Sequence, residues 1–193
     1  MALLILGLVL FLGVHSTRIF ADGWRSSLIT RLGPLKWKGL YSLASIIGFV
    51  VLIYGYKLAR QETMMLWTSP SWMKHVTALL MMFAFILFVS PYVPGNSFKA
   101  RLHHPQVLSV MVWALSHLLT TGIVAGVVLF GGFLIWAVLS FRAARQRDRV
   151  AGTVYPPGNA IGTSIAIAAG LVAWSVFALL LHGPLIGVRP LGY

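Results

Sequence analysis

The sequence lacks cysteine and has very few acidic residues. None of its 193 residues is a Cys, which excludes disulfides, thiolate metal sites, cysteine nucleophiles and covalent C-x-x-C-H haem attachment. Asp22, Glu62 and Asp148 are its only carboxylates, and all three lie between apolar segments. Proton relays and acid/base pairs built on carboxylates within a membrane are therefore excluded, and a Ser-His-Asp triad lacks a credible third member. Histidine, present six times, remains for chemistry.

Charged residues of both signs are scarce, while apolar residues dominate. The chain is 59% hydrophobic and 9% charged, with a mean hydropathy of +0.88. A soluble domain has about 25% charged and 45–50% apolar residues. The composition therefore predicts a membrane protein, with the lipid bilayer as its first partner.

Apolar runs of about 20 residues, the length needed to cross a bilayer, predict an all-α polytopic bundle of about six transmembrane helices in a single domain, 1–193. Residues 106–142 are too long for one span, and Thr120-Thr121-Gly122 is the best place to divide them. The predicted spans are 2–20, 39–58, 72–92, 103–120, 123–141 and 161–182.

The basic residues divide unevenly between the two sides of such a bundle. Of the 15 Lys and Arg residues, 11 follow the first, third and fifth spans, and 4 lie on the opposite side. The positive-inside rule makes the side with 11 cytoplasmic, so both termini are predicted to face the outer, periplasmic side. The net charge of +12 is then mainly an orientation signal, which argues against a nucleic-acid partner.

Two histidines fall within predicted spans. An ionisable residue at that depth is a functional candidate by default, although a His bonded to a neighbouring carbonyl is an equal alternative for His15 and for His117. Trp113 shares a helix face with His117, and Arg18 lies one turn beyond His15. Two such histidines without a nearby Cys or carboxylate suit the axial positions of a haem iron. Capping or interfacial roles are favoured for the other four: His75, His103, His104 and His182.

Several short motifs, in order over about residues 13–140, resemble the NnrU family of membrane proteins. The matching strings are Gly13-Val14-His15-Ser16-Thr17-Arg18, Trp24-Arg25, Lys38-Gly39-Leu40-Tyr41-Ser42-Leu43, Tyr54-Gly55-Tyr56, the Leu66–Trp72 stretch, His104-Pro105 and Trp113-Ala114-Leu115-Ser116-His117-Leu118. The family is named for bacterial proteins linked to nitrite and nitric-oxide reduction, and it includes the plant zeta-carotene isomerase, which uses non-covalent haem b.

The resemblance implies that His15 and His117 are iron ligands of a haem b, with Trp113 beside it and Arg18 as a partner for a propionate. The implied function is accessory to nitrite or nitric-oxide metabolism in the bacterial inner membrane. The alternatives are a haem-dependent cis–trans isomerase of a polyene, and a structural or assembly subunit, as a homo-oligomer or within a larger membrane complex. Ala114 stands where plant isomerases carry a Cys, which argues against a Cys-dependent ligand exchange.

Overall fold

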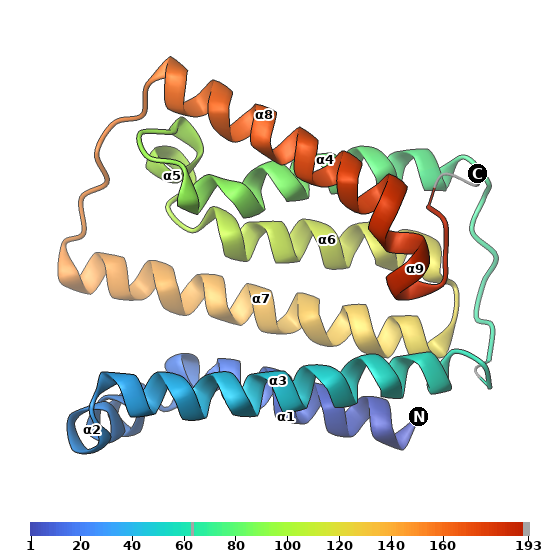
Figure 1. Cartoon of the computed structure of the whole chain (residues 1–193), viewed down its shortest axis with the longest axis horizontal. Coiled ribbons are helices and arrows are strands. Elements are labelled where there is room, and N and C mark those ends of the chain that lie inside the picture. Colours follow the sequence, from blue (N-terminus) through green and yellow to red (C-terminus); the bar gives the residue numbers. More distant parts are fainter. Residues whose placement is uncertain (63, 191–193) are drawn as a thin grey trace. The chain divides into compact units, whose positions relative to one another are not determined.

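The computed structural model describes residues 1–62 and 64–190, and these residues form helices joined by turns and by longer loops, of which the longest follow the helices that end at Ala59 and Ala151 (Figure 1). The described part contains no strand, only two isolated bridges. The helices are α1 (Ala2–Phe20), α2 (Asp22–Leu32), α3 (Pro34–Ala59), α4 (Met73–Val89), the 3₁₀ turn η1 (Ser90–Tyr92), α5 (Ser97–Leu102), α6 (Pro105–Thr121), α7 (Val124–Ala151), α8 (Ala160–Val176), the π-helical turn η2 (Phe177–Leu181) and α9 (His182–Ile186). The predicted all-α membrane fold is confirmed.

Five helical segments within the described residues are long and apolar enough to cross a membrane. They are α1, α3, α4 with η1, α7, and α8 with its continuation to Ile186. The predicted span 103–120 is also helical, as α6, but its 17 residues are at the short end of the spanning range. Helices α2 and α5 occupy segments that the hydropathy pattern predicts as loops.

The predicted break at Gly122 is confirmed, because α6 ends at Thr121 and α7 begins at Val124. Gly122 has a φ of 56°, a conformation that residues with a Cβ rarely adopt. Its carbonyl accepts hydrogen bonds from the backbone N–H groups of Leu66 and Trp67 at 2.8 and 3.2 Å. A side chain here would also meet the carbonyl oxygen of Trp67.

The chain forms two compact units. Unit 1 comprises residues 1–68 and 122–143, and unit 2 comprises residues 69–121 and 144–193, of which 191–193 lie outside the described residues. In unit 1, α1 and α3 lie side by side (Figure 1) because glycines allow their backbones to approach closely. A Cβ on Gly55 would lie 2.6 Å from the carbonyl carbon of Leu3, and one on Gly48 would lie 2.8 Å from the amide nitrogen of Phe11.

Unit 2 is built on the packing of α4 against both α6 and α8. Small side chains make this possible: Ala84, Ala114 and Ala166 are fully or almost fully buried. Gly158 and Gly162 lie against backbone, since a Cβ on Gly158 would lie 2.5 Å from Cα of Ser97 and one on Gly162 would lie 2.5 Å from the carbonyl oxygen of Pro94.

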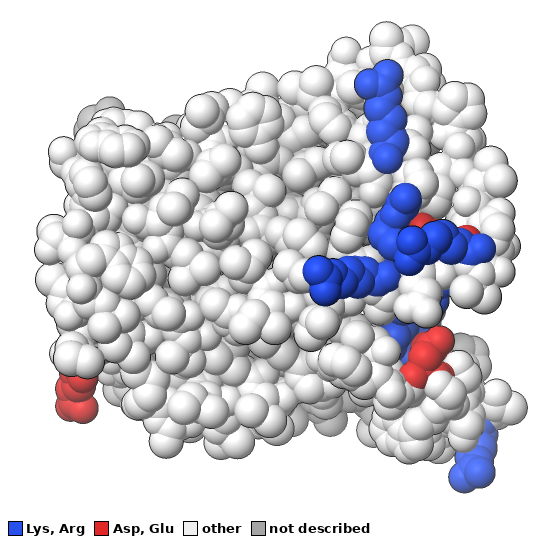
Figure 2. Space-filling view, turned by 180° about the vertical axis from the view of Figure 1, so that it is seen from behind, with Lys and Arg blue, Asp and Glu red and all other residues white. Residues whose placement is uncertain are grey.

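Apolar side chains cover much of the outside of the spanning helices. On α3, Ile46 and Val50 are 61% and 60% exposed, and on α8 Val172 is 63% exposed. Figure 2 shows broad areas without a charged side chain. Such surfaces are stable in hydrocarbon rather than in water, so these helix faces contact the lipid bilayer.

Candidate functional site

His15 lies in the second half of α1, where the close approach of α1 and α3 fixes its surroundings. Gly48 of α3 touches the backbone of Phe11, one turn before His15 on α1. The Nδ1 atom of His15 is 2.7 Å from the carbonyl oxygen of Phe11. Because a carbonyl can only accept, Nδ1 carries the proton and the lone pair of the ring is on Nε2.

Aromatic rings from three helices of unit 1 surround the His15 imidazole. Its ring centroid is 4.3 Å from that of Phe11 on α1, 5.4 Å from Tyr41 on α3 and 6.1 Å from Trp136 on α7. Phe133 on α7 adds a contact of 5.8 Å to Phe11. We call these four aromatic residues the His15 cage: Phe11, Tyr41 and Trp136 contact the imidazole, and Phe133 packs on Phe11.

One member of the His15 cage has an unsatisfied polar atom. The indole Nε1 of Trp136 is buried and has no hydrogen-bond partner among the residues that the structure describes. A buried donor without an acceptor costs about 1–3 kcal/mol, so native structures rarely keep one without a reason. Trp136 is therefore a direct neighbour of His15 whose polar atom stays unsatisfied among the described residues.

His117 lies on α6 in unit 2 and repeats the arrangement of His15. Its Nδ1 is 2.9 Å from the carbonyl oxygen of Trp113, one turn earlier, and the two rings are 5.6 Å apart. The sequence prediction that Trp113 and His117 lie together is confirmed by these distances. Ser116 is fully buried, and its carbonyl accepts a hydrogen bond of 3.0 Å from Thr77 of α4, which joins α4 to α6 beside His117.

The other predicted site residue, Arg18, lies in the last turn of α1, one turn beyond His15, and is exposed. The remaining histidines are placed differently. His75 is exposed, and the Nδ1 of His182 donates to the carbonyl oxygen of Val188 at 2.7 Å.

His103 and His104 belong to a polar cluster in unit 2 that also contains Arg145, Asp148 and Tyr155. The Nε2 of His104 and the hydroxyl of Tyr155 both donate to Oδ2 of Asp148, at 2.7 and 3.0 Å. The ring of His103 stacks on Tyr155 with centroids 4.1 Å apart, and its Nδ1 accepts from the Arg145 guanidinium. We call this group the Asp148 cluster.

The backbone at the Asp148 cluster is strained. His103 has a φ of 64° and a ψ of −48°, and the N–H of His104 donates to the carbonyl of Leu102 at 2.8 Å, which closes a rare three-residue turn. Partial burial, and then the hydrogen bond to Asp148, raise the pKa of Tyr155 above its ordinary value. Tyr155 therefore remains a neutral donor, and the cluster holds the 97–105 segment to the end of α7.

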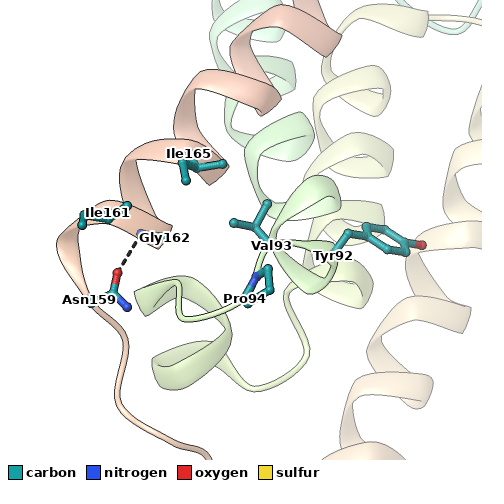
Figure 3. Close-up of a pocket in the computed structure, with 7 residues that line it drawn as sticks. All are labelled: Tyr92, Val93, Pro94, Asn159, Ile161, Gly162 and Ile165. Atoms are coloured by element: carbon teal, nitrogen blue, oxygen red, sulfur yellow. Dashed lines mark hydrogen bonds between the residues drawn. The ribbon is translucent and has the colours of Figure 1, made fainter.

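An open apolar hollow of about 480 Å³ lies elsewhere in unit 2, between η1 and the start of α8 (Figure 3). Val93, Pro94, Ile161 and Ile165 supply most of its lining, and Asn159 caps α8 beside it by accepting from the Gly162 N–H at 2.7 Å. None of the histidines lines this hollow, so it offers space for an apolar group but no metal ligand.

A comparison with protein-family models matches residues 3–190 to the family described as NnrU protein. The chain belongs to the NnrU family. No curated protein and no solved structure matches it.

The donor set of this NnrU-family chain can be tested against the haem that the family resemblance implies. Among the described residues, no group of three or more His, Cys, Asp or Glu side chains is close enough to hold a bare metal ion. A haem iron needs only one or two protein ligands, because the porphyrin supplies four. Each of these two imidazoles, His15 in unit 1 and His117 in unit 2, has its proton on Nδ1 and is of the kind that a haem iron takes as a ligand.

Trp136 is the residue of this NnrU-family chain that the sequence analysis misses. It lies within an apolar run, where an aromatic residue carries no distinguishing signal of its own. Tyr41 enters the sequence analysis only as part of the motif from Lys38 to Leu43, yet its ring packs on His15.

Proposed function

We propose that the chain is an integral-membrane protein that binds haem b, with His15 and His117 as the axial iron ligands. The observation that carries the proposal is the shared geometry of these two histidines. Each donates from Nδ1 to the carbonyl four residues earlier on its own helix, at 2.7 Å for His15 and 2.9 Å for His117.

This geometry prepares an imidazole for iron in two ways. Donation from Nδ1 fixes the tautomer, so that Nε2 is the nitrogen that coordinates, and it raises the basicity of that nitrogen. It also fixes the orientation of the ring, since the helix backbone holds the acceptor in place. The same bond would satisfy a buried His that binds no iron, so the optical test below decides between the two roles.

The surroundings support a porphyrin rather than a hydrated ion. The rings of Phe11 and Trp136 pack on His15, and Phe133 packs on Phe11. Aromatic surroundings between helices suit a flat apolar macrocycle. Bound haem would supply an iron centre able to change oxidation state or bind a small ligand such as nitric oxide. Arg18, one turn from His15, would pair with a propionate.

The proposed role is accessory to nitrite or nitric-oxide metabolism, in the bacterial inner membrane. Its support is family membership and the motifs around His15 and His117, together with the membrane helices. Reduced protein exposed to nitric oxide should show a shifted optical spectrum if the haem senses or handles this gas.

The test of haem binding is the optical spectrum of protein purified in mild detergent from haem-replete cells. The wild type should show a Soret band, and His15→Ala and His117→Ala should each lose most of it. His75→Ala is the matched control, because His75 is exposed, and it should keep the band. A colourless wild type would overturn the proposal and favour the structural-subunit alternative.

A haem-dependent cis–trans isomerase of a polyene is the second candidate. The open apolar hollow between η1 and α8 favours it, because its lining of Val93, Pro94, Ile161 and Ile165 suits an apolar substrate. Ala114 is fully buried in α6 and carries no thiol, so a cysteine ligand is not available. Cells fed a cis-polyene should show an isomer shift only when they carry the gene, and equal chromatograms would exclude this candidate.

A further inference from the structure

We propose that Trp136 is a haem-binding residue whose indole N–H donates a hydrogen bond to a haem propionate. The inference rests on the proposed haem and names a residue that the family motifs do not contain. It starts from the buried Nε1 of Trp136, which has no partner among the described residues.

The position of Trp136 identifies where the missing acceptor belongs. Its ring stands edge-on to the His15 imidazole, with an interplanar angle of 87° and centroids 6.1 Å apart. The other close neighbours of His15 are Phe11, which has no polar side-chain atom, and Tyr41. Trp136 is therefore the direct neighbour of His15 that carries a buried donor without an acceptor among the described residues.

The chemistry of haem b decides which of its atoms can accept. Its four pyrrole nitrogens bind iron and its vinyl and methyl groups are apolar, so the two propionate carboxylates are the acceptors that it offers. A carboxylate is also the acceptor for which an indole N–H gives a charge-assisted hydrogen bond. Arg18 lies on α1 one turn from His15. Its guanidinium is a cation in the same unit that can also pair with a propionate carboxylate.

This assignment predicts that removing the Trp136 N–H does not destabilise the haem-free protein but weakens its binding of haem. Trp136→Phe keeps an aromatic ring in the His15 cage but removes the N–H. Without haem, the variant should be at least as stable as the wild type, because an unsatisfied buried donor has been removed. With haem, the variant should bind more weakly, because a hydrogen bond to a charged group has been lost.

The experiment titrates haem-free protein in detergent with two probes, haem b and its dimethyl ester, in which the carboxylates are blocked. Trp136→Phe should weaken haem binding about tenfold to hundredfold and change binding of the dimethyl ester less than about threefold. Trp37→Phe is the matched control, because Trp37 lies in the same unit and its ring contacts Tyr41 rather than His15; it should leave both affinities unchanged.

Three results would overturn the assignment, and they are distinguishable. If Trp136→Phe and the wild type bind haem with equal affinity, the proposed hydrogen bond does not form. An equal loss for haem and its dimethyl ester makes Trp136 a packing residue only. A wild type that binds neither probe overturns the proposed function itself, and the role of Trp136 with it.

Discussion

Two pairs of histidines in this chain have opposite environments. His15 and His117 lie in apolar helices, and each ring is held by a carbonyl of its own helix. His103 and His104 lie in the turn before α6, and their rings pair with Arg145 and Asp148. The same side chain is thus used for two purposes.

The two pairs differ in which ring nitrogen carries the proton and donates a hydrogen bond. In His104, Nε2 donates to Asp148 at 2.7 Å, so the proton is on that nitrogen and the residue is a structural donor. In His15 and His117, Nδ1 carries the proton and Nε2 the lone pair. In the proposed function, the Nδ1 bond to the backbone makes Nε2 the nitrogen that would bind iron, whereas the bond of His104 to a carboxylate serves the fold.

Among variants that affect His15 but not the Asp148 cluster, Gly48→Val is expected to have the largest effect on stability and haem content. A Cβ at Gly48 would lie 2.8 Å from the amide nitrogen of Phe11 and 3.0 Å from its Cα, so α1 and α3 must move apart at the turn that holds His15. We expect a loss of about 3 kcal/mol in the free energy of unfolding and a loss of the Soret band. Thermal denaturation followed by circular dichroism measures the first, and absorption the second.

The matched control is Gly13→Ala, also in a helix of unit 1. A Cβ on Gly13 would meet no atom within 4 Å, and replacing a helical Gly by Ala stabilises by up to about 1 kcal/mol. Wild-type stability and haem content in Gly48→Val would contradict the close helix approach on which the His15 cage depends.

A smaller effect, of a different kind, is expected from Asp148→Ala. Its carboxylate accepts from His104 and Tyr155 and is largely shielded, with a side chain 16% exposed. The variant should lose about 2 kcal/mol of stability, since hydrogen bonds to a charged group are worth about 1.5–3 kcal/mol. The haem spectrum should not change, because the Asp148 cluster holds the fold rather than the iron.

Asp22→Ala provides the comparison for Asp148→Ala. Asp22 is 46% exposed and its ion pair with Arg25 is 3.5 Å long within one helix, so its removal should cost no more than about 0.5 kcal/mol. Equal melting temperatures for the two variants, or a lost Soret band in Asp148→Ala alone, would show that the two histidine regions have been assigned the wrong roles.

The sequence predicts most of the helices, because a long apolar run leaves little choice in a membrane. The range 2–20 coincides with α1, and the break at Gly122 follows from a residue suited to a positive φ. Hydropathy does not predict α2, whose composition is polar on balance. It also places the end of α7 ten residues early, because the Arg-rich segment 142–151 continues the helix without being apolar.

The candidate site is predictable only in part. Depth alone singles out His15 and His117, and the i, i+4 spacing pairs Trp113 with His117. The contact of Trp136 with His15 cannot be predicted, because which face of α7 meets α1 depends on tertiary packing. For the same reason the sequence does not reveal that His104 pairs with Asp148, 44 residues later.

The central claim, that His15 and His117 together ligate one haem iron, is tested most directly by electron paramagnetic resonance of the oxidised protein. Two imidazole ligands predict a low-spin ferric signal in the wild type. His15→Ala and His117→Ala should each abolish it, whereas His75→Ala, His103→Ala, His104→Ala and His182→Ala should preserve it. A high-spin wild type, or loss of the low-spin signal in His103→Ala or His104→Ala but not in His15→Ala, would contradict the account.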